Sequence, residues 1–216
     1  MTDIYNIPYE INTIVDYDFY KDYLGHNHFK EKFKQRLEYI KNKYENNKIT
    51  EDDLIKKYFV EIFSWSVIPR EILFNIQNIL KENNISVIID PCCGNAFHTF
   101  LFDTFCGFNT LSNDNQPEYL GWSSTTNLDG IKFLDDLNED EHYNGALILS
   151  WIEGEELAFN LLEAFIGNIV ISIGNYQNNT RYSDDLNYFY ELKLRFKMYM
   201  PWKHYENIEI HIRKIN

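Results

Sequence analysis

The chain has 216 residues, of which 44% are hydrophobic and 25% are charged, with only 9 glycines and 5 prolines. This composition is typical of one globular domain with a sizeable core, and it excludes collagen-like and broadly disordered chains. The 33 acidic residues outnumber the 20 basic ones and give a formal net charge of −13, so the mean surface repels phosphate backbones and disfavours broad, sequence-independent nucleic-acid binding.

The cysteines and the beginning of the chain favour a reduced, cytoplasmic environment. Three cysteines are present, and the two adjacent ones, Cys92 and Cys93, do not suit a conventional disulfide framework. Residues 1–10 contain neither the basic nor the apolar region of a secretion signal. No stretch approaches the roughly 18 apolar residues that a membrane span needs. We therefore expect a cytoplasmic protein without a membrane partner.

The first part of the chain has helical periodicity. Between residues 29 and 44, apolar side chains recur at steps of three and four among Lys and Glu, which predicts an amphipathic helix. Thr50 and Asp53 have the spacing of a capping box and predict the start of a second helix. Pro69 suits the first turn of a third helix, which we expect to end near Asn84.

From residue 85 onward, short apolar runs alternate with stretches of helical period, as in βαβ units with strands buried on both faces. The runs that predict strands are 86–90, 109–113, 146–151 and 169–173. Two further segments, 196–200 and 208–213, surround Pro201–His204 and predict a terminal antiparallel hairpin. The sequence thus predicts an α/β domain over residues 65–216, preceded by an N-terminal helical extension over residues 1–64.

The loop after the first predicted strand is the first candidate binding site, because open α/β sheets bind ligands beyond the carboxyl ends of their strands. This loop reads Asp-Pro-Cys-Cys-Gly-Asn-Ala over residues 90–96. Its small residues permit close backbone approach to a ligand, and the following helix offers free N–H groups. A Gly-x-Gly-x-x-Gly fingerprint is missing, so a dinucleotide is a worse fit.

A carboxylate at the end of the second predicted strand is the second candidate. Asp114 stands 20 positions beyond Gly94 (114 − 94 = 20). This spacing suits an acid that accepts hydrogen bonds from two ribose hydroxyls. The same residue also suits an Asx turn with Asn115 and Gln116. The sequence leaves both interpretations open.

The run from Ile88 to Phe97 resembles the first motif of class I S-adenosylmethionine-dependent methyltransferases, in the Asp-Pro-x-Cys-Gly-x-Gly form found among nucleic-acid amino-methyltransferases. The resemblance implies a Rossmann-like, mostly parallel seven-stranded sheet with a C-terminal antiparallel hairpin. It also implies S-adenosylmethionine as cofactor and methyl transfer to an acceptor that the sequence does not identify. Cys92, Gly94 and Ala96 stand where the family has three glycines. The cofactor-binding residues that the resemblance implies are Asp90, Cys92, Gly94, Asn95, Asp114, Ser150 and Trp151.

The end of the strand predicted over 146–151, which corresponds to the fourth strand of the family, departs from the family pattern. Ser150-Trp151-Ile152-Glu153 stands where amino-methyltransferases carry Asp or Asn, two prolines and an aromatic residue, which argues against methylation of an exocyclic base nitrogen. Trp151 suits either stacking on a planar ligand or core packing. Glu153 suits either proton acceptance or the N-terminus of a helix.

Two residues outside these loops are further candidates. His204, in the predicted hairpin turn, is the titrating group best placed for general-base catalysis, although an exposed loop histidine without a role fits equally. Trp65 lies where methyltransferases often have a segment that closes over the cofactor, and it also suits packing. Together with Glu153, His204 completes the set of catalytic candidates.

Other functions remain open at this stage. Cys92, Cys93, His98 and Cys106 lack Cys-x-x-Cys spacing, so we expect no metal site. The main alternative is a catalytically inactive methyltransferase-like scaffold that acts as a binding or regulatory subunit, which Cys92 and Ala96 in place of two of the three glycines favour. A third is a nucleoside- or nucleotide-binding protein of different chemistry. A protein partner fits any of the three.

Overall fold

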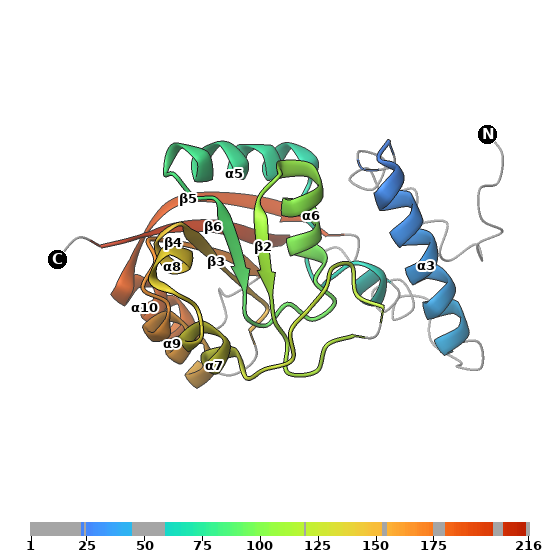
Figure 1. Ribbon diagram of the computed structural model, residues 1–216. Helices are drawn as coiled ribbons and strands as arrows, with labels where there is room; N and C mark the ends of the chain where they lie inside the picture. The colour runs from blue at the N-terminus through green and yellow to red at the C-terminus, as the bar shows by residue number, and fades with distance from the viewer. Residues whose placement is uncertain are drawn as a thin grey trace.

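Six strands form one sheet in this computed structural model, which describes residues 23, 25–44, 59–118, 120–152, 155–174, 180–200 and 205–214. The strands are β1 (Val87–Asp90), β2 (Asn109–Ser112), β3 (Gly145–Ser150), β4 (Ile169–Gly174), β5 (Tyr190–Tyr199) and β6 (Tyr205–Arg213). Their order across the sheet is β2-β1-β3-β4-β6-β5, as Figure 1 shows. The fold is therefore mixed α/β.

The first four strands are parallel, and the last two run against them. β1 pairs in parallel with β2 and β3, and β3 pairs in parallel with β4. β6 is antiparallel to both β4 and β5. Asp90 at the end of β1 aligns with Ser112 at the end of β2, so the loops that follow these strands leave the sheet at one common edge.

The helices of the described residues connect and cover these strands. They are α3 (Asn27–Tyr44), α5 (Arg70–Glu82), α6 (Phe97–Cys106), α7 (Gly130–Asp135), α8 (Glu139–Tyr143), α9 (Glu155–Ala164) and α10 (Thr180–Phe189). The helices predicted over 29–44 and after Pro69 correspond to α3 and α5. The predicted capping box of Thr50 and Asp53 lies outside the described residues. Among the described helices, none combines the length and hydropathy that crossing a bilayer demands.

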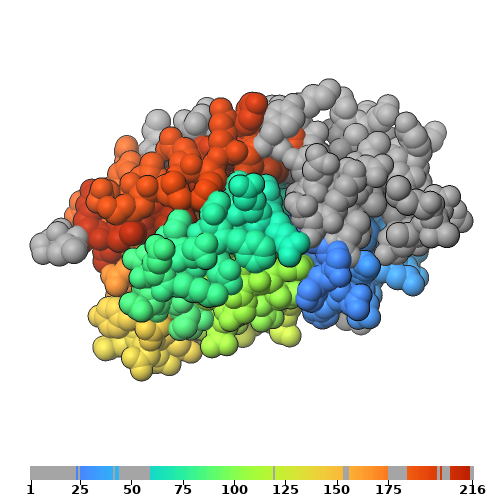
Figure 2. Space-filling model, turned by 90° about the horizontal axis from the view of Figure 1, so that it is seen from above, coloured from blue at the N-terminus to red at the C-terminus, as the bar shows by residue number. Residues whose placement is uncertain are grey.

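Two hydrophobic cores lie on the two faces of the sheet. Ile88, Ile148 and Ile171 point into the core under α3, α5 and α6. Their neighbours along the strands, Ile89 and Leu147 among them, point into the core formed with α7, α9 and α10. Successive side chains of a strand alternate between faces, which explains why the central strands are apolar throughout. Figure 2 shows α3, α6 and α5 neighbouring one another on one face.

The N-terminal helix α3 shares its core with the α/β part of the chain. The ring of Phe29 lies 6.2 Å from that of Phe100 in α6 and 5.1 Å from that of Trp122, measured between centroids. Tyr23 donates a hydrogen bond of 2.7 Å to the carbonyl of Ile68. The division of the chain at residue 64 stays a prediction, and the structure shows extensive packing across it.

The sheet differs from the expected one in two respects. The described residues contain six strands instead of seven, and residues 114–129 contribute only an isolated bridge between Asn113 and Thr126. This segment is rich in polar and turn-forming residues and lacks the apolar run of a buried strand. β5 and β6 pair antiparallel, but both are longer than predicted. Glu191, Lys193 and Arg195 are exposed in the missed part of the edge strand β5, and these charged residues hid its length in the hydropathy pattern.

Candidate functional site

The loop after β1 and the carboxylate after β2 meet at the common edge of the sheet. The backbone N–H of Gly94 donates a hydrogen bond of 2.8 Å to Oδ2 of Asp114. The other carboxylate oxygen, Oδ1, accepts a 2.8 Å bond from the N–H of Gln116. The Asx turn and the approach to the glycine loop therefore coexist, and one side chain makes both.

The loop itself turns tightly at two small residues. Gly94 has a φ of 55° and Ala96 a φ of 60°, both in the left-handed region. This conformation costs an alanine roughly 1–2 kcal/mol more than a glycine. A Cβ added to Gly94 would meet nothing within 4 Å, so open space lies in front of the loop. Asn95 holds the loop in place, since its side-chain amide donates to the carbonyl of Phe63 at 2.6 Å.

Asp90 is a buried carboxyl group at the base of this loop. Its Oδ1 accepts a weak hydrogen bond of 3.4 Å from the N–H of Cys92, and its Oδ2 has no hydrogen-bond partner. Burial, with a smaller contribution from the nearby Asp114 carboxylate, raises the pKa of Asp90 to about 8. At neutral pH the carboxyl group is therefore mostly protonated, and a cation placed beside Oδ2 would favour its ionised form.

Trp151 is held in a strained conformation just after β3. Its φ of 50° is left-handed, which is unusual for a bulky residue. The indole Nε1 donates a 2.7 Å hydrogen bond to Oγ of Ser66, and this hydroxyl donates in turn to the carboxylate of Glu206. A Cβ added to Gly174 would lie 3.3 Å from the indole. Trp151 thus sits over a glycine and is fixed from both sides.

Trp65 is the second tryptophan of this region. Its ring centroid lies 5.7 Å from that of Trp151, with 38° between the two planes. Trp65 is 44% exposed. Trp65 is therefore only partly buried and lies at the site. The two neighbouring indoles form a continuous aromatic surface.

Two adjoining cavities open at this edge of the sheet. The first, of about 390 Å³, is named here the Asp114 cavity, and its lining includes Asp114, Asp129 and Gly130. The second, of about 270 Å³, is named the Trp65 cavity. Its lining includes Glu61, Ser64, Trp65, Gly94, His98 and Glu118. Cys92, Ser150 and Trp151 line both cavities and form the wall between them.

Most of the predicted cofactor-binding residues converge on these cavities. Cys92, Asp114, Ser150 and Trp151 line the Asp114 cavity, and Gly94 and Asn95 line the Trp65 cavity. Asp90 lines neither and lies buried beneath the loop. The two catalytic candidates, Glu153 and His204, lie outside the described residues.

The cysteines of the loop are poorly suited to thiolate chemistry. Burial, reinforced by the Asp90, Asp114 and Asp129 carboxylates, raises the pKa of Cys92 to about 12. Burial also raises the pKa of Cys93 far above its ordinary value. Among the described residues, no group of three or more His, Cys, Asp or Glu side chains is arranged to hold a metal ion.

Sequence reasoning missed Asp129 and Gly130 at the start of α7. Oδ1 of Asp129 caps this helix by accepting from the N–H groups of Ile131 and Lys132, at 3.0 and 3.2 Å. A Cβ on Gly130 would lie 3.2 Å from the carbonyl oxygen of Pro91, so a glycine lets α7 approach the loop after β1. An Asp-Gly pair before a helical apolar pattern was the available signal.

His98, in the first turn of α6, was considered only as a metal ligand. Its Nε2 lies 2.9 Å from the carbonyl oxygen of Ser66 and 3.2 Å from Oγ of Ser64. A carbonyl oxygen only accepts, so Nε2 carries the proton. Burial lowers the pKa of His98 to about 4. This histidine is therefore neutral at physiological pH.

Arg36 connects α3 to the Trp65 cavity. The side chain is almost fully buried. One guanidinium nitrogen donates to Oε2 of Glu118 at 2.5 Å and to the carbonyl of Leu120 at 2.8 Å. The other donates to the carbonyl of Glu61. One arginine thus holds two segments that line the cavity.

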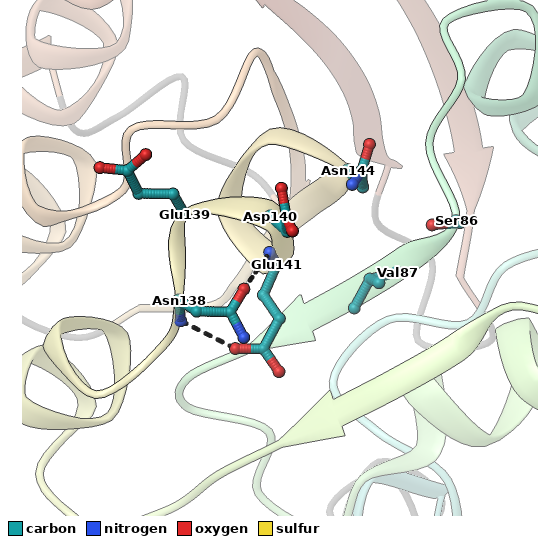
Figure 3. A pocket seen from close by; sticks show the side chains of 7 residues that line it. All are labelled: Ser86, Val87, Asn138, Glu139, Asp140, Glu141 and Asn144. Carbon is teal, nitrogen blue, oxygen red and sulfur yellow. Dashed lines mark hydrogen bonds between the residues drawn. The ribbon is translucent and has the colours of Figure 1, made fainter.

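A larger depression of about 470 Å³ lies at the opposite edge of the sheet, near the amino ends of β1 and β3. Figure 3 shows Asn138 and Glu141 joined by reciprocal hydrogen bonds, both of 2.9 Å, which cap α8. The Glu139 side chain points away from Ser86 and Val87. Asn138 and Glu141, which line the depression, thus serve the helix cap. Because parallel sheets bind ligands at their carboxyl edge, this depression is not the candidate site.

Comparison with known proteins adds information at the level of the fold. No protein-family model matches the sequence, and no curated protein sequence matches it. Among solved structures, TrmN from Thermus thermophilus superposes with a TM-score of 0.50 at 10% identity, over 66% of this chain and 48% of TrmN. The chain therefore spans about half the length of TrmN, and the likeness concerns the fold alone.

Two further matches are structures of proteins named as methyltransferases. Precorrin-6y C5,15-methyltransferase from Geobacter metallireducens GS-15 has a TM-score of 0.46 at 14% identity, over 69% of this chain and 90% of that protein. The N-methyltransferase NodS from Bradyrhizobium japonicum WM9, in complex with S-adenosyl-L-homocysteine, has a TM-score of 0.42 at 10% identity, over 65% of this chain and 86% of that protein.

Proposed function

We propose that this chain is a class I methyltransferase that binds S-adenosylmethionine in the Asp114 cavity and transfers its methyl group to an acceptor. The observation that carries the proposal is the 2.8 Å hydrogen bond between Gly94 N–H and Asp114 Oδ2. It joins the two sequence elements that the family resemblance assigns to the cofactor. An open cavity of about 390 Å³ lies beside them.

The residues present fit the cofactor's chemistry. Asp114 borders the cavity and retains lone pairs for ribose hydroxyls. Asp90 lines neither cavity, so its role would be to support the loop from beneath. Cys92, which replaces a glycine of the family pattern, lies toward α7, because its Sγ would be 3.3 Å from a Cβ on Gly130. A Cβ on Gly94 would meet nothing within 4 Å, so the space before this residue, on the side of the Trp65 cavity, is also open.

The second replacement in the loop is also compatible with a ligand. Ala96 adopts the left-handed conformation that the family's third glycine would supply. Phe97 is buried with its ring 4.9 Å from that of Trp122, and it lines neither cavity. Neither residue fills the site, which favours a binding protein over a scaffold whose cofactor site is blocked.

The chain's own contribution to catalysis would be positioning. When bound, the cofactor would supply a methyl group activated by a positively charged sulfur, with a neutral thioether as leaving group. Trp151 and Ser150, in the wall between the cavities, would hold the acceptor against that methyl group. Such alignment of reacting atoms at roughly 3–3.5 Å supplies much of the rate, so no strong general base is required.

The first prediction is that Asp114→Ala weakens binding of S-adenosylhomocysteine by about 10- to 100-fold, because charged hydrogen bonds contribute about 1.5–3 kcal/mol each. Isothermal titration calorimetry measures it. Asp103→Ala, which removes an exposed carboxylate on α6, serves as the matched control and should bind normally.

The same titration separates the alternatives. Absence of binding to the wild-type chain at millimolar ligand would favour the inactive scaffold. Equal affinity for adenosine and S-adenosylhomocysteine would favour a nucleoside-binding protein, since the homocysteine part would then contribute nothing.

A further inference from the structure

We propose that the Trp65 cavity is the acceptor site and that it takes a small, uncharged, planar aromatic molecule. This inference rests on the function proposed for the neighbouring Asp114 cavity. Three independent features of the Trp65 cavity support it, namely its aromatic wall, its balanced charge and its size and position.

The aromatic wall consists of Trp65 and Trp151. Their centroids lie 5.7 Å apart at an angle of 38°, so they contact each other, and both line the cavity. Trp65 keeps 44% of its surface exposed. Planar rings stack favourably on indole faces of this kind, in offset or tilted arrangements.

Trp151 is held in place by features that core packing alone does not require. Its backbone adopts a left-handed conformation, its indole is fixed by Ser66, and Gly174 leaves the space that the ring occupies. Strained conformations persist where the surrounding structure enforces them, and they cluster at ligand sites. The strain here turns an indole toward Trp65 at the wall between the two cavities.

The charges around the cavity are balanced. Glu118 pairs with Arg36 at 2.5 Å, and Glu61 pairs with Lys43 at 2.8 Å. His98 is neutral, because burial lowers its pKa to about 4. Since each carboxylate is matched by a cation, the wall offers no net attraction to an ionic ligand. An uncharged acceptor suits it best.

Size and position complete the argument. The volume of about 270 Å³ lies just below the range for pockets that hold drug-sized molecules, about 300–1,000 Å³. It suits one or two fused rings. Cys92, Ser150 and Trp151 separate this cavity from the Asp114 cavity, so a molecule bound here would lie next to the proposed cofactor.

The test uses the full chain and a pair of probes that differ only in planarity. 2-Naphthol is planar and uncharged at neutral pH, and decahydro-2-naphthol is its saturated counterpart. We expect 2-naphthol to bind at least tenfold more tightly, as measured by isothermal titration calorimetry with and without S-adenosylhomocysteine. Equal affinities for the two probes would overturn the proposal, and so would tighter binding of the planar cation 1-methylquinolinium.

Variants locate the binding. Trp65→Leu should weaken 2-naphthol at least tenfold and leave S-adenosylhomocysteine affinity unchanged, and Trp65→Phe should retain part of the affinity. Tyr188→Leu, which removes an exposed aromatic side chain on α10, is the matched control. Unchanged 2-naphthol affinity in Trp65→Leu would show that the probe binds elsewhere and would overturn the inference.

Competition separates this inference from the proposed function. Displacement of 2-naphthol by S-adenosylhomocysteine would assign the Trp65 cavity to the cofactor and overturn the acceptor site alone. Failure of S-adenosylhomocysteine to bind any form of the chain would overturn the proposed function, whatever the naphthol affinities are.

Discussion

Single buried residues determine the electrostatics of the site, and Asp90 is the clearest case. Its carboxyl group is buried beneath the loop after β1, with one oxygen unpartnered. Burial raises its pKa from 3.8 to about 8. The folded protein therefore keeps a proton on this group over a pH range in which the unfolded chain has released it.

This difference predicts a pH-dependent stability. Between about pH 4 and pH 8, the native state holds one more proton at Asp90 than the unfolded state, so the free energy of unfolding falls as pH rises, by on the order of 1 kcal/mol per pH unit. Asp90→Asn mimics the protonated form and should remove this component. Urea unfolding at pH 5 and pH 7 measures it.

The control for this comparison is the same substitution at an exposed aspartate. Asp103→Asn changes an exposed carboxylate on α6 and should retain the wild-type pH dependence. The free energy of unfolding of Asp90→Asn should be nearly the same at pH 5 and pH 7. If it falls between these two pH values as much as that of the wild type, Asp90 is not the group responsible for the pH dependence.

At the scale of elements, α3 contributes to the site through Arg36. This buried guanidinium bonds to Glu118 and to the carbonyls of Glu61 and Leu120. Two segments that are distant in sequence, one at Glu61 and one at 118–120, are therefore joined to α3 by one side chain. Without Arg36 both carbonyls lose this donor, whereas the carboxylate of Glu118 is partly solvated.

Arg36→Ala should accordingly lower the free energy of unfolding by about 2–4 kcal/mol, mainly through the lost hydrogen bonds to two carbonyls. The expected loss includes weaker binding of 2-naphthol, because Glu61 and Glu118 border the Trp65 cavity. Denaturant unfolding monitored by tryptophan fluorescence measures the stability. Lys34→Ala, an exposed position on the same helix, should change it by less than about 0.5 kcal/mol, and a similar loss in both variants would contradict this role for Arg36.

At the scale of the whole molecule, one hydrophobic core extends from α3 through α5 and α6 to the sheet. Phe29 of α3 contributes to this core through Phe100 and Trp122. A shared core couples the stability of the parts that build it. We therefore expect the helical extension and the α/β part to unfold together.

Phe29→Ala tests this coupling. The substitution should lower the free energy of unfolding by about 3–5 kcal/mol and shift a single calorimetric transition to lower temperature. Differential scanning calorimetry distinguishes this from a separate early transition of the extension. Two transitions, with the later one unchanged, would indicate that residues 1–64 form an independent unit.

The local sequence predicted most of the sheet and the edge at which the site lies. The four parallel strands correspond to the predicted apolar runs, because strands buried on both faces must be apolar throughout. The predicted seventh strand does not occur among the described residues, since segment 114–129 has no such run. Asp129 and His98 were missed because a helix cap and a buried histidine look like ordinary structural residues until their neighbours are known.

The sequence by itself determined which loops carry small and acidic residues at the carboxyl ends of the strands, since hydrophobic periodicity and turn chemistry are local properties. Only the tertiary structure decided that Trp65 faces Trp151, that Arg36 reaches Glu118, and that both cavities share one wall. These contacts join residues more than 80 positions apart (151 − 65 = 86; 118 − 36 = 82). Packing of helices on the sheet creates them, and no local pattern encodes that packing.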